Sequence, residues 1–459
     1  MQDTNSATEQ VTTVVVGAGL SGLSAARRLL SSGIGSFLVV EGDVQVGGRA
    51  LPLRGSPAGQ PPGHMLVWAD DSDVLHLADE LDVAHSRFDP TDNGVDLRLD
   101  REGHVSTTDH NLPLATSWWT RLRSEYLYAR LARLARDADP DSPWRSPDAG
   151  ELDAHTVRGW LRHHSRDPEL LRLLEESLTI EASMPADQIS MLWLIAHLGP
   201  EPEIDPSYVR IDQAELCQRM AASLPAERVR TSWHVARITR TADGVEVSGP
   251  RGTVRCERVI IATAPSDAGQ IDYRPRLPHS RGRLHRQWPA AELIRSELTY
   301  WRPFWRNFGW SGTVYCEDGL PALALDDSPD SGAFGRLVAF THTFGEGDPM
   351  GVDLDVLDNP AQHEGLLLDN LRRVFGPLAA EPREIAHSRD YPGPYSRAYQ
   401  APTPPGLLTD LGPLLRRPVD RMHWAGTETG PYPENGTLDG AIASGIRAAD
   451  EVTAQLDRN

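Results

Sequence analysis

Lysine is absent from this 459-residue chain, so arginine supplies all 45 of its lysine-plus-arginine positions. Aspartate and glutamate outnumber these cations at 65, and the formal net charge is −20 at pH 7. An acidic surface repels phosphate backbones and anionic lipid headgroups. The charge balance therefore argues against nucleic acid and anionic membranes as partners, and a solvated surface is its simplest explanation.

Cysteines and long apolar runs are also scarce. Cys217, Cys256 and Cys316 lie far apart without the paired spacing of a metal or redox site, so we expect buried thiols and no metal. No run approaches the roughly 18 apolar residues that span a bilayer. The polar first ten residues lack a signal-peptide pattern. We therefore expect a cytoplasmic protein without a membrane segment.

The clearest pattern that is present is a glycine-rich turn between an apolar run and a helical repeat. The run ending at Val16 predicts a strand, and the leucines and alanines that follow repeat with helical spacing. Gly17, Gly19 and Gly22 suit a tight turn, close approach to a pyrophosphate and packing of helix on strand. A second strand ends at Glu41, where a carboxylate can bind ribose hydroxyls. Together they predict a dinucleotide site.

The segment after this acid identifies the dinucleotide. Gly47 and Gly48 precede Arg49, and an arginine held behind two glycines can lie along a diphosphate. The arrangement resembles the FAD-binding segment of the glutathione-reductase-like flavoproteins more than that of NAD dehydrogenases. We therefore predict FAD, with a glycine-rich turn in an unrelated α/β domain as the alternative.

The far end of the chain carries a second segment of this kind, in which a strand, a Gly-rich turn and a helix occupy residues 423–452. Two such segments predict an α/β fold with a discontinuous Rossmann-like, glutathione-reductase-like FAD-binding domain. The predicted FAD-binding domain comprises residues 11–70, 205–285 and 400–455. Residues 71–204 and 286–399 would form an inserted α+β substrate-binding domain, with a helical subdomain over about 112–198.

In this order the segments resemble the flavin-containing amine oxidase family, which includes monoamine, polyamine and L-amino-acid oxidases. The resemblance covers nearly the whole chain. It is carried by GAGLSG with Glu41 and GGR, by a hairpin starting at Val235, by PFWR at 303–306, and by AGTET and GTLDGA at 425–429 and 436–441. It implies an FAD-dependent enzyme that oxidises a small-molecule amine, with O2 as the expected acceptor.

The resemblance also implies the cofactor contacts. Ser21, Glu41 and Arg49 would hold the ADP half, and Glu428 would lie by the ribityl phosphate. The N–H of Leu438, at a helix start, would meet the pyrimidine edge of the flavin and stabilise negative charge on it. The complete implied set is Gly17, Gly19, Ser21, Gly22, Glu41, Gly48, Arg49, Gly63, His64, Met65, Leu66, Val235, Gly426, Glu428 and Leu438.

Departures from the family pattern bear on the substrate. Monoamine oxidases tether the flavin to a cysteine just before an aromatic residue, and here Ala398 precedes Tyr399, so we expect non-covalent FAD. Tyr399 would keep one wall of the two-ring cage that guides an amine to the flavin, but the second wall falls at Thr437. A half-open cage favours a bulkier or more polar substrate. Simple core packing is the alternative for Tyr399.

Two further positions concern the chemistry. Most members place a lysine before PFWR, where it holds a water beneath the flavin and assists reaction with oxygen. Here that position is Arg295, and arginine does not replace lysine freely at such a site. The alternative is an arginine paired with a surface acid. Leu66 stands where L-amino-acid oxidases bind a carboxylate, which argues against a simple amino acid. His64 would orient substrate or act as a base, or be a structural histidine.

The implied reaction is loss of a hydride equivalent from a neutral amine to flavin N5, followed by hydrolysis of the imine. An aromatic slot would favour the neutral amine, with Trp193, Phe304, Trp305 and Tyr399 as candidate walls. One alternative is an FAD-dependent C–C desaturase or dehydrogenase of the phytoene-desaturase or protoporphyrinogen-oxidase type. Another is a flavoprotein-like scaffold that binds a partner without chemistry. Nothing in the sequence predicts the oligomeric state.

Overall fold

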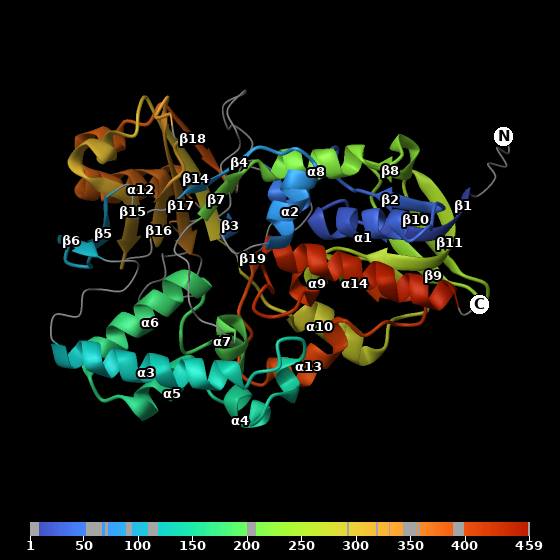
Figure 1. Ribbon diagram of the computed structural model, residues 1–459, viewed down its shortest axis with the longest axis horizontal. Coiled ribbons are helices and arrows are strands. Elements are labelled where there is room, and N and C mark those ends of the chain that lie inside the picture. The colour runs from blue at the N-terminus through green and yellow to red at the C-terminus, as the bar shows by residue number, and fades with distance from the viewer. Residues whose placement is uncertain are drawn as a thin grey trace.

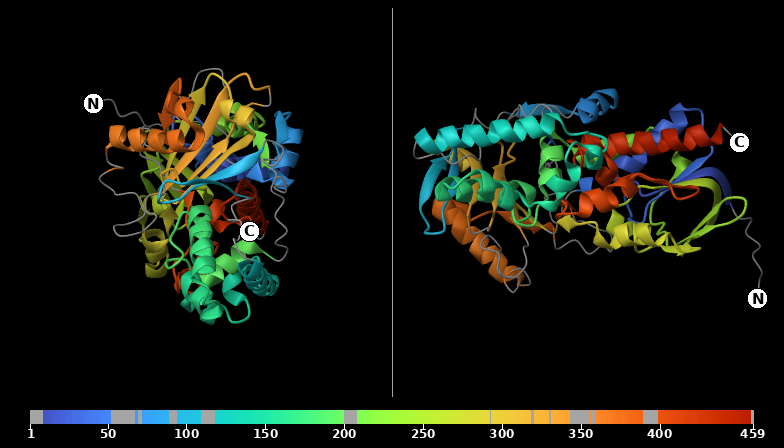
Figure 2. Two further views of the ribbon diagram at one scale, coloured as in Figure 1. Left: turned by 90° about the vertical axis from the view of Figure 1, so that its left-hand side faces the viewer. Right: turned by 90° about the horizontal axis from the view of Figure 1, so that it is seen from below.

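The computed structural model describes residues 9–51, 67–68, 72–88, 94–108, 118–199, 208–291, 293–317, 320–329, 331–342, 356, 359–388 and 399–457. Figure 1 shows a sheet flanked by helices at one end of the molecule, a second sheet at the other end, and a group of helices beneath that second sheet. Seen from below in Figure 2, the red C-terminal helix lies at the first of these ends.

The first sheet is built from segments far apart in the chain. Its parallel strands run in the order β8 (Val229–Arg230), β2 (Phe37–Val40), β1 (Glu9–Val16), β11 (Gly252–Ile261) and β20 (Met422–Trp424). Most of their residues are buried, which explains the continuous apolar runs in the sequence. The discontinuity predicted from the two ends of the chain is therefore present.

An antiparallel extension widens this sheet. β9 (Arg237–Arg240) and β10 (Val245–Gly249) form the predicted hairpin, which pairs with the first half of β11, and β12 (Asp272–Arg274) pairs with β9. The first half of β11 therefore pairs with β10 and its second half with β20.

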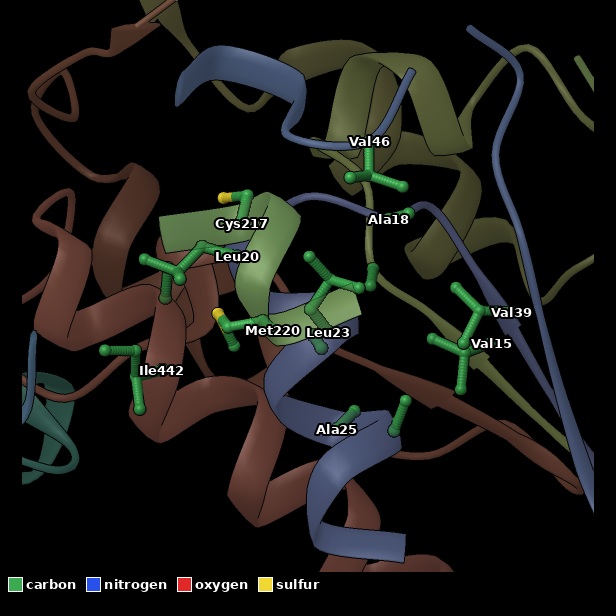
Figure 3. Close-up of a cluster of buried hydrophobic side chains, with 14 of the residues drawn as sticks. Val15, Ala18, Leu20, Leu23, Ala25, Val39, Val46, Cys217, Met220 and Ile442 are labelled. Carbon is green, nitrogen blue, oxygen red and sulfur yellow. The ribbon is translucent and has the colours of Figure 1, made fainter. Parts of the chain in front are cut away.

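Helices α1 (Leu20–Ser31), α8 (Gln213–Ala222) and α14 (Leu438–Leu456) surround the core beside this sheet. Figure 3 shows their side chains gathered with those of β1 and β2 in one cluster. α14 approaches α1 so closely that a Cβ on Gly445 would lie 2.1 Å from the carbonyl oxygen of Ser21. α2 (Ser72–Glu80), which the predicted boundaries assign to the substrate-binding domain, contributes Val74 and Ala78 to the same core.

The second sheet has the order β18 (Glu384–His387), β14 (Leu293–Tyr300), β17 (Gly335–His342), β16 (Leu323–Asp326), β15 (Trp310–Cys316), β5 (Val95–Leu99) and β6 (Val105–Thr108). One of its faces packs against α12 (Pro360–Phe375) through Leu298, Trp305 and Leu371. The PFWR motif begins the 3-10 turn η5 (Phe304–Phe308) between β14 and β15.

The helical group consists of α3 (Trp118–Arg136), α4 (Ala149–Ala154), α5 (Val157–His164), α6 (Pro168–Ala182) and α7 (Met191–Leu198), within the range predicted to be helical. Its core also takes Leu284 of α10 (His279–Gln287) and Leu408 of α13 (Leu407–Leu415). The sequence boundaries had placed both of these helices in the FAD-binding domain. α9 (Pro265–Ala268) precedes α10.

Two small sheets complete the described structure. β7 (Tyr208–Ile211) pairs with β3 (Val67–Trp68) and β4 (His85–Phe88), and β13 (Ala290–Ala291) pairs with β19 (Tyr399–Gln400). Among the helices of the described ranges, none has both the length and the apolar content that crossing a bilayer requires.

Candidate functional site

The parallel strands of the first sheet end at one edge, because Val16 pairs with Val40 and Ile261, and Ile261 pairs with Trp424. The four connections that leave this edge carry the glycine turn, Glu41, Ala262 and the AGTET segment. Ligands of open α/β sheets bind outside the carboxyl ends of the strands. The topology therefore brings both predicted cofactor segments together.

The glycine turn has no room for side chains at two of its predicted positions. Gly17 has φ +99°, and a Cβ on it would lie 2.8 Å from the carbonyl oxygen of Ala262. A Cβ on Gly22 would lie 2.0 Å from the carbonyl oxygen of Gly17. Gly19 forms an isolated parallel β-bridge with Gly47. This bare backbone, ahead of the α1 N-terminus, is a cradle of the kind that binds a pyrophosphate.

Glu41 holds the loops around this cradle. Its Oε2 accepts a hydrogen bond from the backbone N–H of Ala18 at 2.7 Å, and its Oε1 accepts one from Asp43 at 2.8 Å. Burial raises the pKa of Glu41 above its ordinary value, and these backbone donors oppose the rise. The carboxylate thus fixes the glycine turn, and its contact with a ribose stays a prediction.

An ion pair between Arg49 and Glu428 connects the N-terminal and C-terminal cofactor segments. Arg49, in the 3-10 turn η1 (Gly48–Ala50), donates to Glu428 in η8 (Thr427–Thr429) through Nη1–Oε1 at 2.8 Å and Nη2–Oε2 at 3.3 Å. The Glu428 side chain is only 4% exposed, whereas that of Arg49 is 28% exposed. We assigned both residues to the cofactor from the sequence but did not foresee that they pair.

The start of α14 is set by Thr437. Its Oγ1 accepts from the N–H of Gly440 at 3.2 Å and donates to the carbonyl oxygen of Glu434 at 2.9 Å. Leu438 is the first helical residue, and the first N–H groups of a helix have no partner within it. Thr437 is therefore the N-cap of α14, and the hydroxyl is committed to that cap.

Other predicted cofactor positions are placed as follows. Ser21 is buried in the first turn of α1, and Val235 is buried in the core shared by β1, β2 and the β9–β10 hairpin. Gly426 precedes η8 with φ +126°. Tyr399 pairs through its backbone with Ala291. Four predicted flavin-lining residues and the untethered position lie outside the described residues, namely Gly63, His64, Met65, Leu66 and Ala398.

Arg295 forms an ion pair with Glu297, two residues further along β14 and on the same face of the strand. Both side chains are only 3% exposed. Phe340 of β17 lies opposite Arg295. The alternative that Arg295 pairs with a surface acid is therefore wrong, because its acidic partner is buried. The alternation Arg295–Ser296–Glu297 was the sequence signal for this pair, and we overlooked it.

Two of the four candidate wall residues belong to a different core. Trp305 has no exposed surface, and its Nε1 donates to Oδ2 of Asp326 at 2.9 Å. Phe304 packs against it with the ring centroids 5.1 Å apart. These rings fill the core between the second sheet and α12. The prediction that they line a substrate slot is therefore wrong.

Asp439, in the first turn of α14, was not foreseen from the sequence. Its carboxylate accepts from the N–H groups of Asp73 and Val74 at 3.0 and 2.8 Å, and so caps α2 from another helix. Burial raises the pKa of Asp439 to about 6. The acid therefore titrates near neutral pH and links α2 to the start of α14.

This raised pKa predicts a pH dependence. The folded protein retains the Asp439 proton up to about pH 6, whereas the unfolded chain releases it near 3.8. Stability should therefore rise as the pH falls through this window, by about 3 kcal/mol in total. Thermal midpoints of the parent and Asp439→Asn between pH 4 and 7 measure the effect, with Asp450→Asn as the control, because the Asp450 side chain on the same helix is 46% exposed. Parallel curves for the parent and Asp439→Asn would contradict it.

Comparison with known proteins decides the family. A family model described as flavin containing amine oxidoreductase matches residues 20–453. The chain belongs to this family. AofH of Mycobacterium tuberculosis, described as a flavin-containing monoamine oxidase, is 31% identical over 466 residues, which cover 97% of each chain. The L-amino acid dehydrogenase of Synechocystis is 28% identical over 96% of this chain and 95% of that protein.

A solved structure extends the likeness to the fold. Cyclohexylamine oxidase from Brevibacterium oxydans matches this amine oxidoreductase with a TM-score of 0.82 and 26% identity, over 98% of this chain and 100% of that one. The resemblance stated from the motifs is confirmed, and so is the α/β fold with a Rossmann-like FAD-binding part.

The cofactor of this amine oxidoreductase is FAD, held non-covalently. The described residues fit this cofactor. Gly17 and Gly22 allow the tight turn that places the N-terminus of α1 at the strand edge, where a diphosphate would bind, and Arg49 follows the Gly47 that bridges to Gly19 in this turn. The resemblance matches the tethering cysteine of monoamine oxidases to Ala398, and this match stays a prediction because Ala398 lies outside the described residues.

Proposed function

We propose that this enzyme oxidises the C–N bond of a bulky or polar amine to an imine, which water then hydrolyses, and that O2 is the final acceptor. When bound, FAD supplies the N5 atom that accepts a hydride equivalent. Thr437 carries the substrate part of this proposal. Its short side chain caps α14 where an aromatic wall would narrow the approach, and this supports a wider substrate space.

The start of α14 contributes electrostatically. The partial positive charge of a helix N-terminus favours negative charge near the Leu438 N–H. Held against the pyrimidine edge of the cofactor, this N–H would stabilise the electron-rich reduced form and so favour acceptance of the hydride. Thr437 maintains the first turn that presents this group.

The substrate has to react as a neutral amine. An ammonium with a pKa near 10 costs roughly 4 kcal/mol to deprotonate at pH 7, and transfer from water to an apolar space offsets part of that cost. The net charge of −20 attracts the cationic form from solution before it loses its proton. These two effects support capture of an ammonium followed by reaction of the free amine.

Arg295 supports the assignment of O2. It keeps a buried cation on β14 at the position of the family lysine, but Glu297 neutralises much of its charge. A cation stabilises the superoxide-like charge that develops when oxygen accepts an electron. We therefore expect oxygen to serve as acceptor at a lower rate than it would with an unpaired cation.

Product analysis tests this function. The purified enzyme with a panel of primary amines in air should release ammonia and hydrogen peroxide in equal amounts. A C–C desaturase would instead form a double bond without releasing ammonia. Turnover of a primary amine without ammonia would therefore refute C–N oxidation and favour the desaturase. If ammonia forms only when a dye is added as electron acceptor, and no peroxide appears, C–N oxidation stands and only O2 as the acceptor is refuted.

A further inference from the structure

The connection between η8 and α14, residues 430–437, lies between two predicted cofactor groups. Glu428 in η8 precedes it, and Leu438, the first residue of α14, follows it. All residues of the connection are described, and they form turns and bends without a helix or strand. Backbone carbonyls in such a segment have no regular ladder of partners, so side chains or water have to satisfy them. The fold of this connection therefore decides how the two groups are placed relative to each other.

Asn435 lies inside this connection and is only 2% exposed. Its Nδ2 donates to the carbonyl oxygen of Glu428 at 3.0 Å and to that of Gly430 at 3.1 Å. A side-chain amide carries two N–H donors, so these bonds use both of them. Asn435 thus ties the part of the chain just before α14 back to the residue whose carboxylate pairs with Arg49.

Two glycines let the connection lie directly against the first turn of α14. A Cβ on Gly430 would lie 2.8 Å from Cα of Gly440, and a Cβ on Gly440 would lie 2.0 Å from the carbonyl oxygen of Glu434. The hydroxyl of Thr427 in η8 also donates to the carbonyl oxygen of Thr437 at 2.8 Å. Protein interiors packed this closely transmit displacements from one segment to the next. A shift of η8 would therefore also move the start of α14.

The two carbonyls that Asn435 binds differ in their other partners. Arg416, at the C-terminal end of α13, donates to the carbonyl oxygen of Gly430 at 2.6 Å and to that of Thr429 at 2.9 Å. The carbonyl oxygen of Glu428 accepts from Asn435 and from no other donor among the described residues. A buried carbonyl without a donor is unfavourable, so loss of the amide would force η8 to rearrange. Asn435 is therefore the side chain on which the backbone at Glu428 depends.

We propose that Asn435 is a positioning residue, whose amide holds η8 against the start of α14 so that the Glu428 carboxylate and the Leu438 N–H together favour the reduced flavin. This inference rests on the electrostatic part of the proposed function, in which the Leu438 N–H stabilises the reduced form. The field of a helix N-terminus falls off within its first turn, so a small displacement of that turn weakens the effect. Asn435 acts through these two groups and needs no contact with the cofactor.

The test compares two buried asparagines that donate to backbone carbonyls. Asn435→Leu removes both donors from the connection. Asn370→Leu is the matched control, because Asn370 on α12 is 5% exposed and its Nδ2 donates to the carbonyl oxygen of Leu320 at 2.7 Å, beside the second sheet. Both variants should lose thermal stability, since each leaves a buried carbonyl without this donor. A role of Asn435 in the fold alone predicts no further difference between the two variants.

The midpoint potential of the bound flavin separates positioning from folding. It is measured on the FAD-loaded enzyme by reductive titration against a reference dye, without any amine. In Asn435→Leu the protein should favour the reduced flavin about tenfold less than in the parent, which makes the two-electron potential about 30 mV more negative. Asn370→Leu should keep the potential of the parent. Asn435→Gln, which retains both N–H donors on a longer side chain, should recover part of the shift.

Three outcomes decide the inference. A parent-like potential in Asn435→Leu, or an equal shift in Asn370→Leu, would overturn it. If Asn435→Leu does not retain FAD, Asn435→Ser, which keeps one hydroxyl donor, takes its place: a smaller shift of the same sign supports the inference, and a parent-like potential overturns it. Because no amine takes part, a parent enzyme that oxidises no amine would refute the proposed function and leave this result standing.

Discussion

Arg49→Met should yield a protein that loses most of its FAD on purification, with a dissociation constant for FAD about 100-fold above that of the parent. The guanidinium of Arg49 is the bidentate partner of the Glu428 carboxylate. Methionine preserves much of the bulk of the side chain but leaves that buried carboxylate without its cation. An unpaired anion would then lie beside the diphosphate that the glycine cradle is built to accept.

Fluorescence titration of the apoprotein with FAD measures this loss. Arg28→Met is the matched control, since Arg28 pairs with Asp450 on the surface, where both side chains are 46% exposed and such pairs contribute little. Glu428→Gln in the Arg49→Met background removes the stranded charge and should recover part of the affinity. Unchanged FAD affinity in Arg49→Met would show that the ion pair plays no part in holding the cofactor.

Arg295→Met should have the second large effect, on both stability and oxygen use. Removing one partner of a buried ion pair costs about 3–5 kcal/mol, because the other charge is left in a medium that solvates it poorly. Glu297 would be that charge, at 3% exposure. The thermal midpoint of Arg295→Met should fall below that of the parent. The double variant Arg295→Met/Glu297→Leu, which also removes the stranded carboxylate, should recover most of this loss.

Oxygen use separates the two roles of Arg295. Reoxidation of the reduced flavin by O2 should slow at least tenfold in both Arg295→Met and the double variant, because each lacks the buried cation. Arg295→Lys, which keeps a cation at this position, should reoxidise at a rate close to that of the parent. Stopped-flow mixing of the reduced enzyme with O2 gives these rates. A double variant that reacts with O2 like the parent would show that Arg295 serves the fold alone.

Local patterns allowed the cofactor site to be predicted from the sequence. The spacing of Gly17, Gly19 and Gly22 and the position of Glu41 reflect one strand, one turn and one helix, whose geometry follows from nearby residues. The hairpin after Val235 was equally visible, because alternation along a strand needs no distant partner. The helix at Leu438 followed from the glycine-rich segment before it.

Long-range pairings could not be read in the same way. Arg49 and Glu428 are 379 residues apart, and nothing in either neighbourhood indicates that they meet. Asp439 looks like an ordinary acid in the first turn of a helix, whereas its partners belong to α2.

The domain boundaries depend on the same kind of information. Val74 of α2 and Leu408 of α13 are apolar helix residues that suit any core. The path of the chain between the two ends of the molecule decides which core each helix joins. Periodicity identified such helices but could not assign them to a region.

Anaerobic mixing of the FAD-loaded enzyme with amines tests the central claim most directly, because it isolates transfer of the hydride equivalent from any later acceptor. The account predicts that at least one amine bleaches the visible absorption of the flavin and that the matching imine or carbonyl product appears in an amount equal to the flavin reduced. The account would be contradicted if dithionite bleaches the flavin but no amine in a broad panel reduces it.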